Sequence, residues 1–560
     1  MPGHRARHFR YCLANSVIRA RAARDDVAMM HNHHFAQDQP GLMRLLRKAH
    51  AAHVDGALAQ AEKLYKAVLD RDPDNFDALH CLGALNHQRG RLPQALRFLA
   101  AALKRNPRSV DVLSSHGLVL HLLGRIDEAR SSYEAVLAIE PDNLDVLNRL
   151  GAALLHCGSP QEALATLDRV LAQDPEHTEA LGNRGNVLLK LNRPEEAIAC
   201  YDAARRAVGD SARLLTNRAH ALRRLDRPDE ALADLRTAIA LEPNHAEAQF
   251  ELGMTQLALG DFEHGWAAYE RRWDTGAFAV HRRDFTSPLW TGKQSVRDRT
   301  VLLHGEQGLG DTIQFVRYAA HVSRLGATVI LEVQSELAAL LAGLDGAERV
   351  IARGEKLPAF DFHCPLMSLP WAWKTHAINI AAEVPYIKAA ASKAAAWTER
   401  LPAGKPLVGI CWAGRPSHHN DANRSIALAR FAPLFDTPGV QFVSLQRDAS
   451  TDDRALLRRF GNVLDFTGDF ADFADTAALI SQLGLVVSVD TAVAHLTGAL
   501  GKSLALLLPF AADFRWLRGR TDSPWYPTAT LFRQTRFGDW EGVIGQVRNH
   551  LLRLRPASHR

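Results

Sequence analysis

Positions 34 residues apart carry the same kinds of residue through the first half of this 560-residue chain. One series is made of prolines, with Gly209 at the missing step: Pro73, Pro107, Pro141, Pro175 and Pro243. A second series is alanine, namely Ala61, Ala95, Ala129, Ala163, Ala197 and Ala231. A third is glycine or alanine, namely Gly83, Gly117, Gly151, Gly185, Ala219 and Gly253. Three series in phase indicate a repeated structural unit. Because the pattern stops near Trp273, a region of different character must follow the array.

Each repeat is predicted to form two helices, because apolar residues recur twice per unit at helical spacing. Between Asp74 and Pro107 the two helical patterns are separated by a break at residues 89–91. Small residues such as Gly83 and Ala95 predict that the two helices approach closely. Tyrosine and leucine alternate at one further position, from Tyr65 onward, and are expected to fill the gap to the next unit. A proline after each second helix cannot continue it and sets the turn.

The length and the small–small–aromatic–proline pattern of residues 42–275 resemble those of the tetratricopeptide repeat (TPR) family. The resemblance implies a right-handed superhelix whose groove binds a peptide or protein segment. Gly209 replaces the family's proline, and Gly265 replaces alanine where the array ends. Asn183 and Asn217 share one position of the first helix. They resemble the asparagine ladder with which protein O-GlcNAc transferases hold peptide backbone, and the alternative is that they are merely polar and exposed.

Composition excludes several other classes of protein. The net charge is +5, but residues 1–28 carry six arginines and two aspartates, so the rest of the chain sums to about +1 and no nucleic-acid partner is expected. Six scattered cysteines without CxxC spacing argue against disulfides or structural zinc and favour a cytoplasmic location. No apolar run is long enough to span a bilayer, so no integral membrane segment is expected. Residues 1–41 are interpreted as a disordered leader; a transit peptide, or translation starting at Met29 or Met30, is the alternative.

After a linker at residues 276–297, short apolar runs alternate with helical stretches, which predicts a parallel α/β fold. The expected strands are 301–304, 329–333, 349–352, 360–364, 407–412, 441–445, 463–466, 485–489 and 504–508. The proline- and glycine-containing run at residues 401–406 divides the region into halves, residues 298–400 and 401–556. Open parallel sheets bind ligands at the carboxyl ends of their strands, so two facing sheets would leave a cleft between them.

Two segments at such strand ends carry candidate chemistry. In the first, a strand runs through Gly308 and Gly310 into a helix expected to begin near Asp311. The glycines would let backbone approach a substrate, and the alternative for Asp311 is a helix N-cap. In the second, a strand ends at Asp490 and a helix begins with Thr491, whose free N–H groups suit a diphosphate. His495 lies one turn into that helix; the alternatives are N-caps and a core histidine.

Together these segments resemble the ADP-heptose:lipopolysaccharide heptosyltransferases (glycosyltransferase family 9). The matching stretches are residues 308–311 and 490–501. The resemblance implies a GT-B fold, which is two facing Rossmann-like domains, here following an α-solenoid. The layout also resembles the bacterial TPR-containing glycosyltransferases, including those that modify flagellin.

The resemblance further implies roles for individual residues. Asp311 would be the general base, and Arg424 would offset charge on the departing diphosphate. Ser488, Asp490, Thr491 and His495 would hold that diphosphate, and Gln446 would contact the ribose or base. The alternative for Arg424 is a surface salt bridge. Trp412 and the aromatic and cationic run at residues 513–526 are ambiguous between donor contact and packing. No DxD motif stands in a suitable strand context, so neither a metal nor a cofactor is expected beyond the nucleotide-sugar itself.

The sequence therefore predicts an inverting, metal-independent glycosyltransferase acting on a hydroxyl of a protein, flagellin-like or other, held by the repeat groove. Two alternatives stay open. One is a TPR adaptor with an inactive transferase-like domain. The other is a heptosyltransferase-like enzyme acting on lipid-linked glycan.

Overall fold

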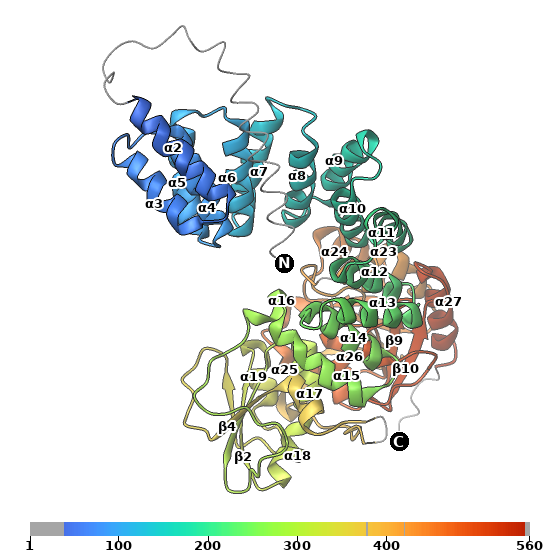
Figure 1. Ribbon diagram of the computed structural model, residues 1–560. Helices are drawn as coiled ribbons and strands as arrows, with labels where there is room; N and C mark the ends of the chain where they lie inside the picture. Colours follow the sequence, from blue (N-terminus) through green and yellow to red (C-terminus); the bar gives the residue numbers. More distant parts are fainter. Residues whose placement is uncertain (1–38, 377–378, 419, 555–560) are drawn as a thin grey trace. The chain divides into compact units, whose positions relative to one another are not determined.

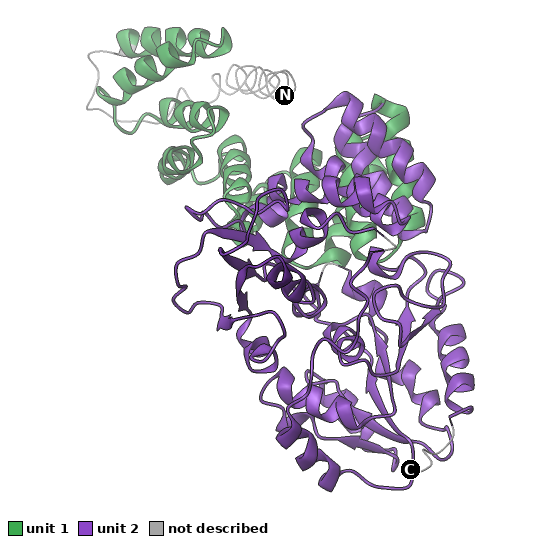
Figure 2. Cartoon of the chain, turned by 90° about the horizontal axis from the view of Figure 1, so that it is seen from below, with its two compact units in different colours: residues 1–209 green, residues 210–560 purple. Residues whose placement is uncertain are grey.

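The computed structural model describes residues 39–376, 379–418 and 420–554. The expected leader lies almost wholly outside these residues. The chain divides into two compact units, residues 1–209 and 210–560 (Figure 2). The division falls inside the repeat array, whereas the sequence suggested a boundary near residue 275.

Unit 1 is built from pairs of antiparallel helices, as the 34-residue period predicts. Its helices are α2 (Gln39–Val54), α3 (Leu58–Leu69), α4 (Phe76–Gln88), α5 (Leu92–Arg105), α6 (Val110–Leu122), α7 (Ile126–Leu137), α8 (Leu144–His156), α9 (Pro160–Gln173), α10 (Thr178–Lys190) and α11 (Pro194–Val208). The side chains of Asn75, Ser109 and Asn143 cap α4, α6 and α8 by accepting a backbone N–H bond. Gly90 and its equivalents turn the chain between the two helices of a pair at positive φ.

The alternating tyrosine and leucine series packs over the glycine series of the same helix pair. A Cβ on Gly83 would lie 2.6 Å from Cγ of Leu99, and one on Gly117 would lie 2.6 Å from Cε1 of Tyr133. These glycines are therefore needed because a bulky side chain of the second helix occupies the space above them. The tyrosines and leucines were expected to fill the gap to the next repeat. The structure shows that they also pack between the two helices of their own repeat.

Unit 2 starts with the last repeat helices, α12 (Ala212–Arg224), α13 (Pro228–Leu241), α14 (Ala246–Ala258) and α15 (Phe262–Tyr269), followed by η1 (Glu270–Asp274) and α16 (Gly276–Ala279). Figure 1 shows α14 and α15 beside the α/β elements. The ring of Trp266 lies edge-on to those of Phe315 and Phe514, with centroids 6.1 and 5.4 Å away. The end of the array thus shares one hydrophobic core with the α/β region.

Two parallel sheets form the α/β region. The first has the order β3-β2-β1-β4, and the second β10-β9-β8-β5-β6-β7. The strands are β1 (Thr300–His304), β2 (Thr328–Val333), β3 (Arg349–Ala352), β4 (Phe362–Pro365), β5 (Leu407–Cys411), β6 (Gln441–Ser444), β7 (Val463–Asp465), β8 (Leu485–Val489), β9 (Leu504–Leu508) and β10 (Ala529–Arg533). Strand order reverses beside β1 in one sheet and beside β5 in the other, the place where open α/β sheets bind ligands.

The parallel α/β architecture is confirmed, and each predicted strand is present to within two residues at either end. The edge strand β10 was not predicted, because it follows the aromatic run that sequence could not assign. The remaining helices are α17 (Leu309–Phe315), α18 (Tyr318–Arg324), α19 (Ser335–Leu341), η2 (Leu366–Ser368), α20 (Leu369–Ala372), α21 (Ala391–Arg400), α22 (Asp421–Arg424), α23 (Leu428–Phe431), η3 (Ala432–Leu434), α24 (Thr451–Leu457), η4 (Thr467–Asp469), α25 (Phe473–Gln482), α26 (Ala492–Ala499), η5 (Phe514–Trp516) and α27 (Trp540–Leu551).

Candidate functional site

Asp311 lies on the first turn of α17, which follows the loop after β1. The helix begins at Leu309, two residues earlier than expected, so Asp311 is its third residue rather than its N-cap. The N–H of Gly308 donates to Oδ2 of Asp311 over 2.9 Å, which fixes the carboxylate at the helix start. Its other oxygen, Oδ1, accepts a hydrogen bond from the guanidinium of Arg515.

The segment from Ser488 to Thr491 connects β8 to α26. Thr491 is the N-cap residue of α26, but its side chain does not cap the helix. Instead its hydroxyl lies 3.1 Å from the hydroxyl of Ser488, which also bonds to the carbonyl oxygen of Val489 over 2.7 Å. The first turn of α26 therefore has no side-chain cap of its own, and such a helix end favours an anion.

The two predicted motifs meet directly at Gly310 and His495. A Cβ on Gly310 would lie 2.8 Å from Cδ2 of His495 and 3.5 Å from Cα of Ala492. Glycine is thus required here by the approach of α26, a reason different from the substrate approach that the sequence suggested. The contact brings Asp311 and the N-terminus of α26 into one region.

His495 is buried among aromatic side chains. Its Nδ1 lies 3.0 Å from the hydroxyl of Tyr526, and its ring stacks on Trp516 with centroids 5.4 Å apart. Burial, reinforced by the charge of Arg515, holds the pKa of His495 well below its ordinary value, so the imidazole is neutral at neutral pH. Nε2 lies 3.7 Å from Oδ1 of Asp490, beyond hydrogen-bond distance.

Asp490 and Arg424 are also brought together. Nη1 of Arg424 donates to the backbone oxygen of Asp490 over 3.0 Å, and its Nε lies 3.4 Å from Oδ1 of Asp421. Burial raises the pKa of Asp490, the Asp513 carboxylate raises it further, and Arg424 opposes both. Asp490 is therefore more easily protonated than an exposed aspartate, and Arg424 is largely buried beside it rather than in a surface ion pair.

Gln446 holds the loop that follows β5. Its Oε1 accepts hydrogen bonds from the N–H groups of Trp412 and Ala413, over 3.2 and 3.0 Å. The Trp412 ring is buried in the core of the second sheet. Gln446 thus lies at the predicted strand end, and its oxygen is bonded to backbone of this chain.

Asn183 lies in unit 1 and Asn217 in unit 2. In unit 1, Nδ2 of Asn183 donates to Oδ1 of Asn148 in the preceding repeat, over 2.8 Å. In unit 2, Asn217 is half-buried on α12. Asn183 is therefore engaged within the solenoid, and neither of its two earlier interpretations is tested by this contact.

Two charged residues that sequence motifs did not mark belong to the same region. Arg515, from the ambiguous run at residues 513–526, pairs with Asp311 and with Asp513. Glu306, two residues before Gly308, bonds through Oε1 to the fully buried Arg272, at 3.3 Å. Burial raises the pKa of Glu306 to about 7, although Arg272 opposes the shift. In the sequence, only the aromatic and cationic composition of residues 513–526 pointed to Arg515, and no pattern pointed to Glu306.

The Arg272 network joins the end of the repeats to the loop after β1. Its guanidinium also donates to Oγ of Ser368 over 2.7 Å and pairs with Glu270. The hydroxyl of Tyr269, on α15, accepts from Nε2 of Gln307 over 2.8 Å. The loop that leads to Asp311 is therefore held by residues of the last repeat.

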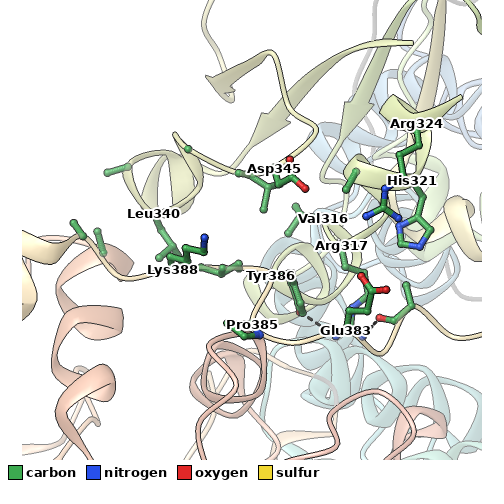
Figure 3. A pocket seen from close by; sticks show the side chains of 18 residues that line it. Val316, Arg317, His321, Arg324, Leu340, Asp345, Glu383, Pro385, Tyr386 and Lys388 are labelled. Atoms are coloured by element: carbon green, nitrogen blue, oxygen red, sulfur yellow. Dashed lines mark hydrogen bonds between the residues drawn. The ribbon is translucent and has the colours of Figure 1, made fainter. Parts of the chain in front are cut away.

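A separate cavity of about 470 Å³ lies between α18, α19 and the segment 381–390 (Figure 3). Its charged and titratable lining residues include His321, Arg324, Asp345, Glu383 and Lys388. None of the predicted site residues lines this cavity. Among the described residues, no group of three or more His, Cys, Asp or Glu side chains is arranged to hold a metal ion. Within the same ranges, no helix is both long and apolar enough to cross a membrane.

Comparison with known proteins agrees with the repeat architecture. One family model described as tetratricopeptide repeat matches residues 55–115, 120–173 and 158–220, and a second matches residues 88–143 and 216–277. Residues 55–277 are tetratricopeptide repeats. Protein FlbA of Caulobacter vibrioides is 27% identical over 328 residues, which are 54% of this chain and 54% of that protein. The chain thus spans about half the length of this curated relative.

Solved TPR structures match a smaller part of this chain than Protein FlbA does. A tetratricopeptide repeat protein from Parabacteroides merdae is 19% identical, covering 42% of this chain and 93% of that one, with a TM-score of 0.38. For pilF of Pseudomonas aeruginosa the identity is 20%, the coverages 37% and 95%, and the TM-score 0.33. YrrB, described as a TPR protein with an unusual peptide-binding site, is 22% identical, with coverages of 33% and 95% and a TM-score of 0.27.

Proposed function

We propose that this chain is a glycosyltransferase of GT-B type that moves a sugar from a nucleotide-sugar to a protein hydroxyl. The observation that carries the proposal is the direct contact between Gly310 and His495. It brings the Asp311 carboxylate, after the first sheet's β1, close to the uncapped first turn of α26, after the second sheet's β8. An acceptor's base and a donor's diphosphate site need such proximity.

Asp311 is the proposed general base. It would take the proton of the acceptor hydroxyl while the oxygen attacks the anomeric carbon and the bond to the nucleoside diphosphate breaks. Attack from the face opposite the diphosphate inverts the anomeric configuration. The helix bond from Gly308 and the ion pair with Arg515 hold this carboxylate in a defined place, which a base in a transfer reaction requires.

The proposed diphosphate site consists of the first turn of α26 and Arg424. Backbone N–H groups and a guanidinium offset the charge that develops on the leaving phosphate, and in this proposal they do so without a metal ion. Neutral His495 can donate or accept one hydrogen bond but adds no charge. Burial raises the pKa of Asp490 to about 6, so the carboxyl is still mostly ionised at neutral pH, and Arg424 beside it offsets that charge.

The repeats are the proposed acceptor-binding part. TPR arrays mediate protein–protein interactions, and an extended groove suits a peptide segment. Tyr269 and Arg272 of the last repeat bond to the loop that carries the proposed base. This link supports a protein acceptor, flagellin-like or other, over a lipid-linked one.

The test is sugar transfer by the full-length chain. Purified protein is incubated with a panel of nucleotide-sugars and candidate protein acceptors, and products are read by intact mass. Asp311→Ala and His495→Ala are expected to reduce transfer by at least about a hundredfold, whereas Asp345→Ala, in the separate cavity, serves as the matched control. Undiminished transfer by both variants would overturn the site. Capture of proteins without nucleotide binding would favour the adaptor, and transfer to lipid-linked glycan alone would favour the third alternative.

A further inference from the structure

Arg515 lies where the two candidate motifs meet, although no motif marks it in the sequence. It belongs to η5, which follows β9 in the second sheet. Its side chain is 9% exposed, and its guanidinium carbon lies 4.5 Å from the ring centroid of Phe514 and 5.6 Å from that of Phe315. Two aromatic rings therefore restrict the plane of the guanidinium.

Three oxygen acceptors share this one guanidinium, and Sδ of Met367 lies 3.6 Å from Nη2. Nε donates to Oε1 of Gln314 over 2.6 Å, and Nη2 donates to Oδ1 of Asp311. Nη1 donates to Oδ1 of Asp513 over 2.8 Å. Two of these acceptors lie on α17 and the third precedes η5. The planar fork of arginine can satisfy them at once, which the single ammonium group of lysine cannot do with the same geometry.

The neighbour of Arg515 closes a ring of contacts around the first turn of α17. Trp516 stacks on His495 at an interplanar angle of 24°, and His495 abuts Gly310. Asp311 follows Gly310 in the chain and bonds back to Arg515. The segment 515–516 thus contacts both the acceptor-side and the donor-side motif.

The charges explain why this contact persists in a buried place. Burial alone would lower the pKa of Arg515, but the Asp513 and Asp311 carboxylates outweigh it and raise the pKa. Burial likewise opposes ionisation of Asp513, and the Arg515 guanidinium overcomes it and lowers the pKa of that carboxyl. Removal of the guanidinium would leave two carboxylates without the cation that they share.

We propose that Arg515 is a positioning residue of the transfer site, which holds the Asp311 carboxylate in place beside the N-terminus of α26. The proposal rests on the proposed function, because that function gives Asp311 its role as base. It adds a residue of η5, which follows the second sheet's β9, to the acceptor side of the reaction. Arg515 acts through Asp311, not on the donor.

Kinetics of the full-length chain test this role. We expect Arg515→Gln to lower kcat about a hundredfold while the donor KM changes less than about threefold, and Arg515→Lys to recover part of the loss. The double variant with Asp311→Asn should be no slower than Asp311→Asn alone, because both changes disable one unit. Arg518→Gln is the matched control, since Arg518 lies three residues on and pairs with Asp226, outside the ring. Losses that multiply, or a change in donor KM alone, would overturn the proposal.

Hydrogen exchange provides a readout that needs no activity. Peptides covering residues 305–315 are expected to exchange at least about fivefold faster in Arg515→Gln than in wild type or Arg518→Gln, because the α17 turn loses its tie. If wild type transfers no sugar, the proposed function fails, and unchanged protection of residues 305–315 then separately rejects the positioning role. If Arg515→Gln does not fold, exchange of residues 305–315 is compared between Arg515→Lys and wild type instead. Faster exchange then supports the positioning role, and unchanged exchange rejects it.

Discussion

Glycines permit close packing in both the repeats and the α/β region, but their partners come from different distances along the chain. In the repeats, Gly151 faces Leu167 of the same helix pair, and Gly83, Gly117 and Gly185 face the equivalent leucine or tyrosine of their own pairs. In the α/β region, Gly310 on α17, after the first sheet's β1, faces His495 on α26, after the second sheet's β8. Local contacts repeat and can be recognised as a period, whereas a contact between distant segments occurs once and leaves no period.

Ion pairs show the same contrast: one in the repeats joins near neighbours in the sequence, whereas one beside the α/β region joins distant residues. Arg193 and Glu196 form an exposed pair three residues apart in unit 1, with side chains 44% and 48% exposed. Arg272 and Glu306 form a buried pair with side chains 0% and 3% exposed. Exposed pairs contribute little to stability, but breaking a buried pair leaves an uncompensated charge.

The largest expected effect follows from breaking the buried pair. Arg272→Ala should lower the free energy of unfolding by about 3–5 kcal/mol, because Glu270 and Glu306 lose their shared cation. Arg193→Ala, the matched change in the repeats, should cost less than about 1 kcal/mol. Urea unfolding of both variants measures the difference, and equal losses would remove the contrast between the regions.

The next effect is a pH dependence centred on Glu306. Its folded pKa of about 7 lies above the ordinary value of 4.5, so its contribution is complete below pH 4.5 and is lost as the pH rises through 7. The stability of wild type relative to Glu306→Gln should therefore fall by roughly 2–3 kcal/mol between pH 5 and pH 8. Glu196→Gln should show no such slope, because Arg193 lowers the pKa of exposed Glu196. The midpoints of urea unfolding, measured from pH 5 to pH 8, test this prediction. The same pH dependence in wild type and Glu306→Gln would contradict the burial argument.

A smaller effect is expected when alanine replaces Gly151 in the repeats or Gly310 in the α/β region. Gly151→Ala places a Cβ 2.6 Å from Cγ of Leu167 and should cost about 1 kcal/mol, because overpacking exceeds the gain in helix propensity. Gly310→Ala should weaken nucleotide-sugar binding at least about tenfold, because the clash falls on His495. Urea unfolding and calorimetric titration are run on both variants. Wild-type affinity in Gly310→Ala would show that this contact is not part of a ligand site.

The smallest effect concerns Asn183. Its loss removes one partly buried hydrogen bond to Asn148, so Asn183→Ala should lower the free energy of unfolding by about 0.5 kcal/mol. If Asn183 also holds acceptor backbone, the KM for a protein acceptor should rise while the donor KM is unchanged. A donor KM that rises with it would argue that unit 1 acts on the nucleotide side.

Much of the fold was predictable, for reasons that particular residues make plain. Gly83 and Leu99 lie within one 34-residue unit, so their relation is repeated and visible. Strands such as Leu504–Leu508 are continuous apolar runs because helices cover both faces of a parallel sheet. Strand β10 lacked such a run and was not predicted, since the polar residues Thr530 and Arg533 interrupt its apolar positions.

The candidate site was only partly predictable. Asp311 and the stretch 490–495 were recognisable because a strand end leads each of them into a helix. Arg515 could not be assigned, since nothing local to residues 513–516 indicates that a carboxylate 204 positions earlier will be its partner. Gln446 was placed at the right strand end, but its bonds to Trp412 and Ala413 depend on how two neighbouring strands are paired.

The repeat array, the parallel α/β region and the strand ends that carry candidate chemistry can be predicted from the amino-acid sequence, because each produces a local pattern of residues. The core that the last repeat shares with the sheets, and the contacts of Glu306 with Arg272 and of Asp311 with Arg515, appear only in the folded chain. The physical reason is that ion pairs and ring contacts between distant segments follow from strand order and packing, which no short stretch of sequence encodes.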